Sequence, residues 1–280
     1  MTAVFLALAS AVGYGVSDFV AGVSSRHRSA WAVAVACQAV ALLVLLVVAI
    51  GRLGDPTPVD LAWGVAAGIG NGVGTGFLFR GLGSGRMSVV APVSAVGAAV
   101  LPVAAGLVVG ERPSMLVWGG ILSALPGICF VSRVVDHPTE STPALGTPLR
   151  DGLFAGLGFG VVFASLGQVP ESAGIQPLLV DQAVALVAIV ALAVMSGEAW
   201  RPRGVALWGG GAAGALGGLS TLCYLLSTHV GALTVVAVLT SLYPAVTIVL
   251  AAAVLRERIH SWQGIGLLLC GVAVALVGAG

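Results

Sequence analysis

Asp18 is the one charged side chain between Thr2 and Ser25, in the stretch GYGVSD at residues 13–18. Tyr14 lies four residues earlier, so on a helix the two side chains share a face. A carboxyl held away from water can bind a cationic amine, or take up and release a proton, because an apolar environment disfavours its charged form. The pair can therefore present a carboxylate and a phenol hydroxyl to one ligand, and Asp18 is the candidate for proton coupling.

A structural role for Asp18 is the alternative. An ionised group deep in a membrane is costly, and it usually marks a pathway or is paired. Asp18 could form an ion pair with an arginine such as Arg80, or it could be wetted by the surface around Arg26 and Arg28. The sequence leaves both interpretations open.

The elements that must hold Asp18 follow from the composition. The chain has 280 residues, 58% of them hydrophobic and 8% charged, with a mean hydropathy of +1.08. Soluble domains carry about 25% charged residues, and a membrane-spanning helix needs roughly 20 apolar residues. We therefore predict an all-α integral membrane protein with ten transmembrane helices. Their predicted ranges are 2–23, 30–51, 60–82, 88–110, 114–134, 151–170, 176–196, 204–228, 232–255 and 261–279.

Other residue types agree with this class. All six tryptophans lie at or near predicted span ends, as expected for indole rings at a membrane interface. The four cysteines fall within predicted spans and show no metal-ligand spacing. We expect no metal, no cofactor and no disulfide, and the net charge of +1 gives no indication of a nucleic-acid partner.

The chain repeats itself. The word QAVAL occurs at 38–42 and again at 182–186, an offset of 144 residues, and GYGV at 13–16 faces GFGV at 158–161. At an offset of 146 residues, VVA at 89–91 matches 235–237, and Glu111-Arg112 matches Glu257-Arg258. Because these matches keep their order and spacing, we predict a duplication with halves at 1–134 and 151–280, joined by a polar linker at 135–150.

Five predicted helices in each half is an odd number, so the second half enters the membrane from the opposite side. We therefore predict inverted repeats. Inverted repeats that enclose a site near the midplane and expose it alternately to the two sides are a design of secondary transporters.

The motifs resemble a known family. They are a Gly-aromatic-Gly turn in the first span of each half, a Glu-Arg pair before a glycine-rich last helix in both halves, Tyr243-Pro244, and the run LLLCGV at 267–272. This pattern is similar to the EamA-like branch of the drug/metabolite transporter superfamily. The resemblance implies a 5+5 helix fold that transports small metabolites such as amino acids, amines or drugs. Members often carry Trp-Gly early in the first helix, where this chain has Gly13-Tyr14-Gly15.

Further polar residues fall inside predicted spans. Asn71 lies among glycines, and Gln182, which follows Asp181, is the repeat partner of Gln38. Each could line a cavity or simply form interhelical hydrogen bonds. Pro244 is expected to break the ninth helix and free carbonyls near Thr240, with Pro92 and Pro102 acting similarly in the fourth. The candidate substrate-binding residues are Tyr14, Asp18, Asn71, Asp181, Gln182, Tyr224 and Tyr243.

Charges near span ends bear on turns and on orientation. Glu111 and Glu257 each adjoin an arginine, which favours local salt bridges that fix short turns.

Ten of the twelve arginines fall in or beside odd-numbered loops, which by the positive-inside rule places those loops in the cytoplasm and both termini outside. The family resemblance implies the opposite orientation.

The sequence thus predicts a secondary active transporter, as an exporter by family resemblance, in a bacterial inner membrane. Arginine-rich composition without lysine is typical of a GC-rich bacterial genome. The expected partners are a small-molecule substrate and membrane lipid, with a monomer as the working expectation. A channel or a lipid flippase is the alternative. An intramembrane Ser/His enzyme is disfavoured because Ser220 and His229, nine residues apart, fall on nearly opposite helix faces.

Overall fold

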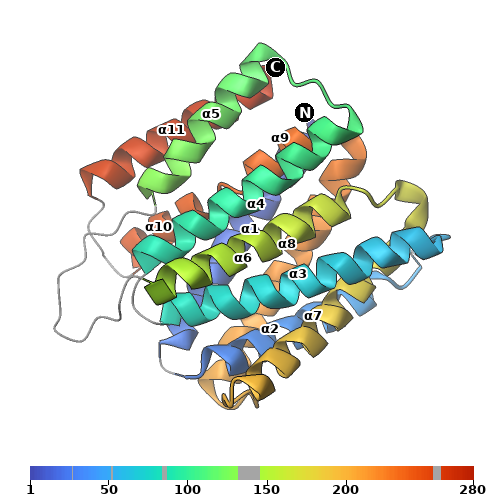
Figure 1. Cartoon of the computed structure of the whole chain (residues 1–280), viewed down its shortest axis with the longest axis vertical. Coiled ribbons are helices and arrows are strands. Elements are labelled where there is room, and N and C mark those ends of the chain that lie inside the picture. The colour runs from blue at the N-terminus through green and yellow to red at the C-terminus, as the bar shows by residue number, and fades with distance from the viewer. Residues whose placement is uncertain (27, 52, 84–86, 132–145, 255–259) are drawn as a thin grey trace.

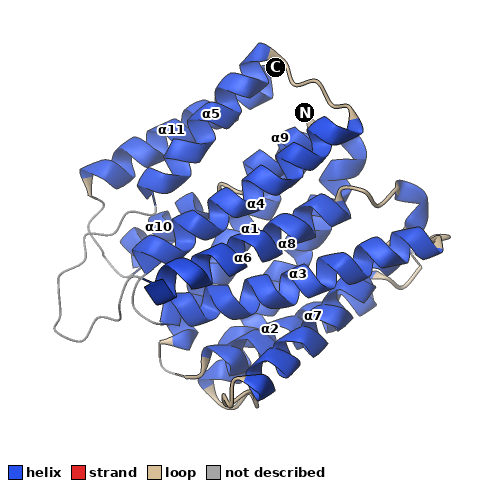
Figure 2. Ribbon diagram, in the orientation of Figure 1, coloured by secondary structure: helices blue, strands red, loops and turns tan. Residues whose placement is uncertain are grey.

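A computed structural model describes residues 1–26, 28–51, 53–83, 87–131, 146–254 and 260–280. Within these residues the protein is a bundle of long helices with no named strand (Figures 1 and 2). The helices are α1 (Thr2–Ser25), α2 (Ala30–Val48), α3 (Pro58–Gly83), α4 (Met87–Val109), α5 (Met115–Val131), α6 (Gly146–Leu166), α7 (Gln176–Met195), α8 (Val205–Val230), α9 (Leu233–Thr240), α10 (Tyr243–Val254) and α11 (Ser261–Ala279), with a short 3-10 helix, η1, at Glu171–Ala173.

Membrane-spanning character is clear for most of these helices. Among the described residues, seven helical segments are long and apolar enough to cross a bilayer: α1, α2, α7, α8, α11, the Leu149–Leu166 part of α6, and the segment Leu233–Val254, which comprises α9 and α10. The Val93–Val109 part of α4 and the whole of α5 are shorter apolar helices. The protein is therefore a multi-pass membrane protein, while the count of ten spans stays a prediction because α3, rich in glycine and polar residues, is not among them.

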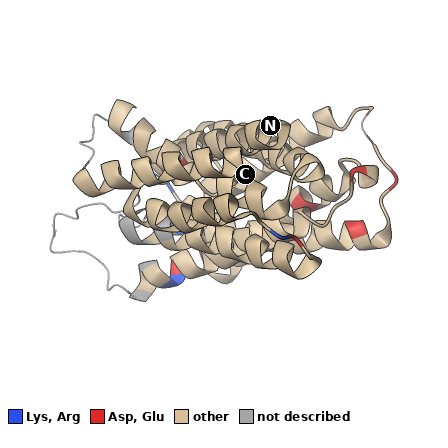
Figure 3. Cartoon of the chain, turned by 90° about the horizontal axis from the view of Figure 1, so that it is seen from above, with Lys and Arg blue, Asp and Glu red and all other residues tan. Residues whose placement is uncertain are grey.

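Charge is sparse along the bundle. Most of the ribbon in Figure 3 carries neither acidic nor basic side chains. Much of the predicted linker 135–150 lies outside the described residues, and its last part, 146–150, begins α6 earlier than expected.

The helices of the two halves interleave. α1 packs along α8 in the antiparallel sense, because Ser10 Oγ donates to the Ser220 carbonyl and Ser17 Oγ donates to the Ala213 carbonyl, both at 2.8 Å. α3 packs along α6 in the same sense, with Gly70 against Gly158. Since α1 corresponds to α6 and α8 to α3, these two pairs are equivalent. The parallel pairs α2 with α8 and α7 with α3 are equivalent in the same way.

Close approach at glycine makes this interleaving possible. A Cβ on Gly214 of α8 would lie 2.0 Å from the Cys37 carbonyl oxygen of α2, and a Cβ on Gly158 of α6 would lie 2.5 Å from the Gly70 carbonyl oxygen of α3. Neither distance is possible for a real side chain. Small residues of this kind are what membrane helices use to bring their backbones into contact.

One ion pair joins the two halves. Arg80 on α3 donates through Nε to Asp151 Oδ2 on α6 at 3.1 Å, and its Nη2 contacts Asp151 Oδ1. Asp151 is 2% exposed, and the Arg80 guanidinium also lies 4.5 Å from the centre of the Phe77 ring. Arg80 is thus engaged by Asp151, so the alternative in which Arg80 pairs with Asp18 is wrong.

Glu111 also links the halves. Its Oε1 accepts the Leu233 N–H at 2.5 Å and its Oε2 accepts the Thr234 N–H at 2.9 Å, so it caps the N-terminus of α9. Arg112 instead donates to the main-chain carbonyls of Leu107 and Glu111. The predicted local salt bridge is therefore replaced by a helix cap across the repeats, which satisfies N–H groups that a helix start leaves unpaired. Glu257 lies outside the described residues.

The ninth predicted span is divided as expected. α9 ends at Thr240 and α10 begins at Tyr243, with a turn at Ser241-Leu242 just before Pro244. Pro244 has no N–H to donate to the Thr240 carbonyl, which accounts for the break. In the fourth span the expectation was wrong, because α4 continues as one helix through Pro102.

Removal of the Asp151 carboxylate should destabilise the contact between the halves. Asp151→Asn leaves the Arg80 charge without its partner, and we expect a loss of about 3 kcal/mol in the free energy of unfolding, because breaking a buried pair costs more than replacing it. The measurement is SDS-induced unfolding of the purified protein in mild detergent.

Two variants control that experiment. Asp55→Asn removes an exposed carboxylate and should change the unfolding free energy by less than about 0.5 kcal/mol. The double variant Arg80→Met/Asp151→Leu should recover much of the lost stability, since an apolar pair replaces the ion pair. Equal free energies of unfolding for Asp151→Asn and Asp55→Asn would show that the ion pair does not stabilise the contact between the halves.

Candidate functional site

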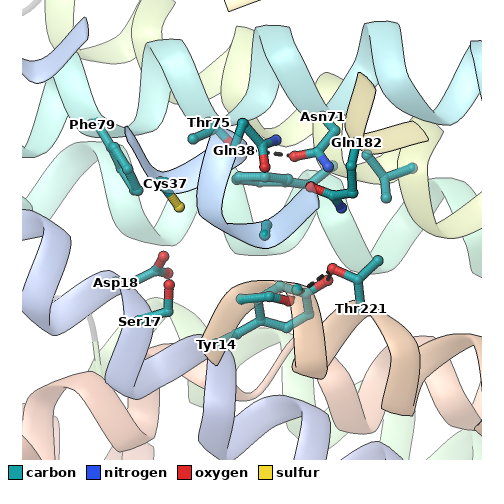
Figure 4. A pocket seen from close by; sticks show the side chains of 15 residues that line it. Tyr14, Ser17, Asp18, Cys37, Gln38, Asn71, Thr75, Phe79, Gln182 and Thr221 are labelled. Carbon is teal, nitrogen blue, oxygen red and sulfur yellow. Dashed lines mark hydrogen bonds between the residues drawn. The ribbon is translucent and has the colours of Figure 1, made fainter. Parts of the chain in front are cut away.

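A small cavity lined by both apolar and polar residues lies where the first three helices of both halves meet. Its volume is about 50 Å³. Six helices contribute to its wall: α1, α2, α3, α6, α7 and α8. The lining residues are Tyr14, Ser17, Asp18, Cys37, Gln38, Ala41, Asn71, Thr75, Phe79, Phe159, Val162, Gln182, Gly217, Gly218 and Thr221 (Figure 4).

Asp18 occupies one end of this cavity. In Figure 4 it lies beside Ser17 and below Cys37, away from Asn71 and Gln182. Ser17 is not available to it, because Ser17 Oγ donates to the Ala213 carbonyl. Within the described residues Asp18 has no hydrogen bond and no ion pair. Its carboxyl therefore faces the cavity without a partner from the described part of the chain.

Asp181 is held quite differently. Asn71 Nδ2 donates to both of its carboxyl oxygens, at 3.1 and 3.4 Å, and Gln182 Nε2 donates to Oδ2 at 3.1 Å. Thr75 Oγ1 in turn donates to Asn71 Oδ1 at 3.1 Å. Asp181 has no exposed surface and does not line the cavity, so it positions the two amides that do.

Two glutamines with equivalent places in the repeats face the cavity. Gln38 is 3% exposed and Gln182 is 1% exposed. Within the described part of the chain, Gln38 Nε2 and Gln182 Oε1 are buried without a hydrogen-bond partner. Because Gln182 Nε2 already donates to Asp181, the amide orientation of Gln182 is fixed and its Oε1 stays a free acceptor.

Tyr14 belongs to the cavity and to an aromatic cluster beneath it. Its hydroxyl and Thr221 Oγ1 are 2.7 Å apart, across α1 and α8. Its ring centre lies 6.0 Å from that of Phe163 and 6.3 Å from that of Tyr243. Phe163 also stacks on Tyr224 at 4.5 Å.

Tyr224 and Tyr243 lie behind the wall in this structure. The Tyr224 hydroxyl donates to the Phe163 carbonyl at 2.7 Å, and the Tyr243 hydroxyl lies 3.5 Å from Ser94 Oγ. Neither lines the cavity. Contact of either tyrosine with a substrate therefore stays a prediction that needs another conformation of the protein.

The two repeats contribute unlike chemistry to the shared site. The equivalent of Asp18 on α6 is Phe163, and the equivalent of Asp181 on α2 is Cys37. Each half thus carries one carboxyl at or behind the cavity wall, on a different helix of the repeat, and of the two it is Asp18 that lines the cavity. Tyr14 and Phe159, which are equivalent to each other, both line the cavity.

The structure places four of the seven candidate binding residues on the cavity: Tyr14, Asp18, Asn71 and Gln182. Sequence reasoning missed the threonines Thr75 and Thr221, which stand 146 residues apart at equivalent positions. That spacing equals the offset found for the Glu-Arg pairs, so a search for polar residues kept in both repeats would have found them.

The chain is a multi-pass helical bundle of two interleaved halves, with a cavity between them that carries a few polar side chains. The profile of the EamA-like transporter family matches residues 1–133 and 152–279, one copy in each half. The chain belongs to the EamA-like transporter family, a family of membrane transporters within the drug/metabolite transporter superfamily.

Solved structures agree on the fold. A protein known from its crystal structure is 16% identical to this chain and superposes with a TM-score of 0.75, over 98% of this chain and 95% of the other. At this identity the likeness shows a shared fold. A search of curated protein sequences finds no match.

The contact between Asn71 and Asp181 should be measurable as a coupling energy. Asn71→Ala removes two amide contacts to a buried carboxyl and should lower the free energy of unfolding by about 2 kcal/mol. In a double-mutant cycle with Asp181→Asn we expect a coupling of about 1–2 kcal/mol, because the two residues touch. The measurement is SDS-induced unfolding in mild detergent.

Ser123→Ala provides the matched control for this cycle. Ser123 Oγ donates to the Leu269 carbonyl between α5 and α11, so it shares no partner with Asp181. Its effect should add to that of Asp181→Asn within about 0.5 kcal/mol. A cycle for Asn71 that is equally additive would rule out the hydrogen bonds described here.

Proposed function

We propose that the protein is a secondary active transporter of small organic amines, including amine-bearing metabolites or drugs, coupled to protons through Asp18. The observation that carries this proposal is the Asp18 carboxyl, which faces the central cavity without a partner among the described residues. A carboxyl in this position can exchange a proton for a substrate cation, since the two compete for one negative charge.

The cavity chemistry favours a cation. Asp18 is the only carboxyl on its wall, and within the described lining there is no arginine or histidine to balance it. Tyr14, Phe79 and Phe159 add ring faces, which attract ammonium groups. The free acceptor at Gln182 Oε1 can take a hydrogen bond from an N–H donor. An anionic substrate would find no matching charge here.

The size of the cavity supports a mechanism with more than one conformation. A volume of about 50 Å³ is room for a few water molecules, whereas pockets that hold small organic ligands are about 300–1,000 Å³. A substrate therefore needs the six helices to separate on one side. The division of the ninth span into α9 and α10 supplies a place where one half can bend.

Helix directions support inverted repeats. α5 and α11 are equivalent in the two halves and pack antiparallel, because Gly120 lies against Val277 whereas Val131 lies against Gly266. Equivalent helices run in opposite directions when the second repeat is inverted. Two inverted bundles around a midplane site are the arrangement that permits alternating access.

Location and direction follow as part of the proposal. Arginine without lysine favours a bacterial chain, and we place the protein in the inner membrane. Export is the proposed direction.

Ser220 Oγ and His229 Nε2 bond to different main-chain carbonyls, those of Leu216 and Val169, which gives no support to an intramembrane hydrolase.

Transport in proteoliposomes tests the role of Asp18. The wild type is screened for gradient-driven accumulation of labelled amines, amino acids and quaternary cations. We expect Asp18→Asn to abolish accumulation driven by a proton gradient while it keeps exchange of substrate for substrate, because the amide cannot carry the proton. Asp55→Asn, which removes an exposed carboxylate, is the control and should transport as the wild type does.

Two outcomes oppose the proposal. Full gradient-driven accumulation by Asp18→Asn would remove Asp18 from coupling. Flux that never saturates and does not respond to substrate on the other side would indicate a channel, and movement of labelled phospholipid between leaflets would indicate a flippase.

Cys37 offers a native probe of alternating access. It lines the cavity beside Asp18, so in a variant that lacks Cys129, Cys223 and Cys270 it is the one thiol left. We expect a small membrane-impermeant thiol reagent to reach Cys37 from either side of the membrane, at rates that a saturating substrate changes in opposite directions. A Cys37 thiol unreactive from both sides under all conditions would exclude the mechanism.

A further inference from the structure

A second pocket lies at one end of the bundle, where α1 leads into α2 and α7 leads into α8. Its volume is about 500 Å³, and it shares no lining residue with the central cavity. The lining residues are Arg28, Ser29, Ala32, Glu198, Ala199, Trp200, Arg201, Arg203 and Ala206.

Positive charge dominates this pocket. Three arginines against one glutamate leave its wall with a net charge of +2. All three arginines are exposed, and none of them forms an ion pair within the described residues. The Arg201 guanidinium lies 5.4 Å from the ring centre of Trp200, which is an arrangement that holds the side chain in place at a membrane interface.

Unpaired hydrogen-bond donors at the start of α2 favour an anion. α2 and α8 both begin at the pocket, at Ala30 and Val205, and no described side chain caps either start; at α8 the main-chain carbonyls of Arg203 and Gly204 accept the Ala206 and Leu207 N–H groups. Ser29 Oγ, on the pocket wall, is buried and has no hydrogen-bond partner among the described residues. The α2 N-terminus, with its partial positive charge, and an unpaired hydroxyl therefore accompany the arginines.

The helix equivalent to α8, which is α3, begins differently at the other end of the bundle. α3 and α7 begin near Asp55 and Asp60, and Asp60 Oδ2 accepts the Thr57 N–H at 2.8 Å. Asp60 N–H donates to Thr57 Oγ1 at 3.3 Å, so the chain caps the α3 start with its own side chain, whereas no described side chain caps the α7 start. The uncapped and basic α8 start therefore differs from its repeat equivalent, α3.

We infer that the Arg28/Arg201/Arg203 pocket binds a phosphate-bearing anion, with arginines as bidentate donors to the phosphate oxygens. Planar guanidinium groups match phosphate geometry, and basic pockets between membrane helices hold phospholipid head groups. The phosphate can belong to an anionic lipid head group or to a soluble ion. This inference does not depend on the proposed transport function.

The test measures binding to the full chain in detergent by native mass spectrometry. The probes are phosphatidylglycerol, phosphatidylcholine as the neutral-lipid comparison, and inorganic phosphate as a soluble competitor. We expect phosphatidylglycerol to bind in preference to phosphatidylcholine, and Arg201→Gln/Arg203→Gln to raise its apparent Kd by about 10- to 30-fold. Arg112→Gln, at an exposed arginine elsewhere, should leave the Kd unchanged.

Glu198→Gln gives a test of opposite sign. This substitution removes the carboxylate that faces the arginines, so it should tighten phosphatidylglycerol binding, and it keeps the inference testable if the double arginine variant does not fold. Displacement by millimolar phosphate, with a rise in Tm on phosphate alone, would assign the site to a soluble anion. Resistance to phosphate would assign it to the lipid head group.

Three results would overturn the inference. They are equal binding of the two lipids to the wild type, an Arg201→Gln/Arg203→Gln variant that folds and binds phosphatidylglycerol as the wild type does, and no binding of either phosphatidylglycerol or phosphate.

Discussion

Close contact between helices at small residues is the constraint on which this structure depends. Lipid tails are as apolar as leucine, so burial of apolar surface does little to hold membrane helices together, and van der Waals packing must do so. Here the closest contacts, such as Gly214 with Cys37 and Gly158 with Gly70, join helices of different halves. The same approach brings α1, α3, α7 and α8 near enough for their polar side chains to share one cavity. Fold and site therefore rest on the same glycines.

Much of the fold could be predicted from the sequence. The lengths of the apolar blocks located the helices to within a few residues, and the repeated short sequences indicated an internal duplication. Details that depend on tertiary partners could not be predicted. Glu111 looked like half of a local ion pair with Arg112, yet its partners are the Leu233 and Thr234 N–H groups more than 120 residues away. Nothing in the spacing of Pro102 and Pro244 showed that only one of them interrupts a helix.

The site was predictable to the extent that it lies on one helix. Tyr14 and Asp18 are four residues apart, so helical geometry alone puts them on one face, and both line the cavity. The link between Asn71 and Asp181 joins α3 to α7, whose mutual packing no local pattern reveals. Arg80 illustrates the same limit, because its partner Asp151 is near in space only once the halves have interleaved.

Interleaving has a consequence for synthesis in the cell. The main neighbours of α1, α2 and α3 are α6, α7 and α8, so the helices made first have few lasting contacts with one another. While the ribosome is still producing the second half, Asn71 and Arg80 lie in the membrane without their partners Asp181 and Asp151. Insertion machinery or chaperones have to shelter these groups for that interval. A gene fragment that encodes the first half alone lacks Asp151 and Asp181, so even a second copy of that half could not supply partners for Arg80 and Asn71.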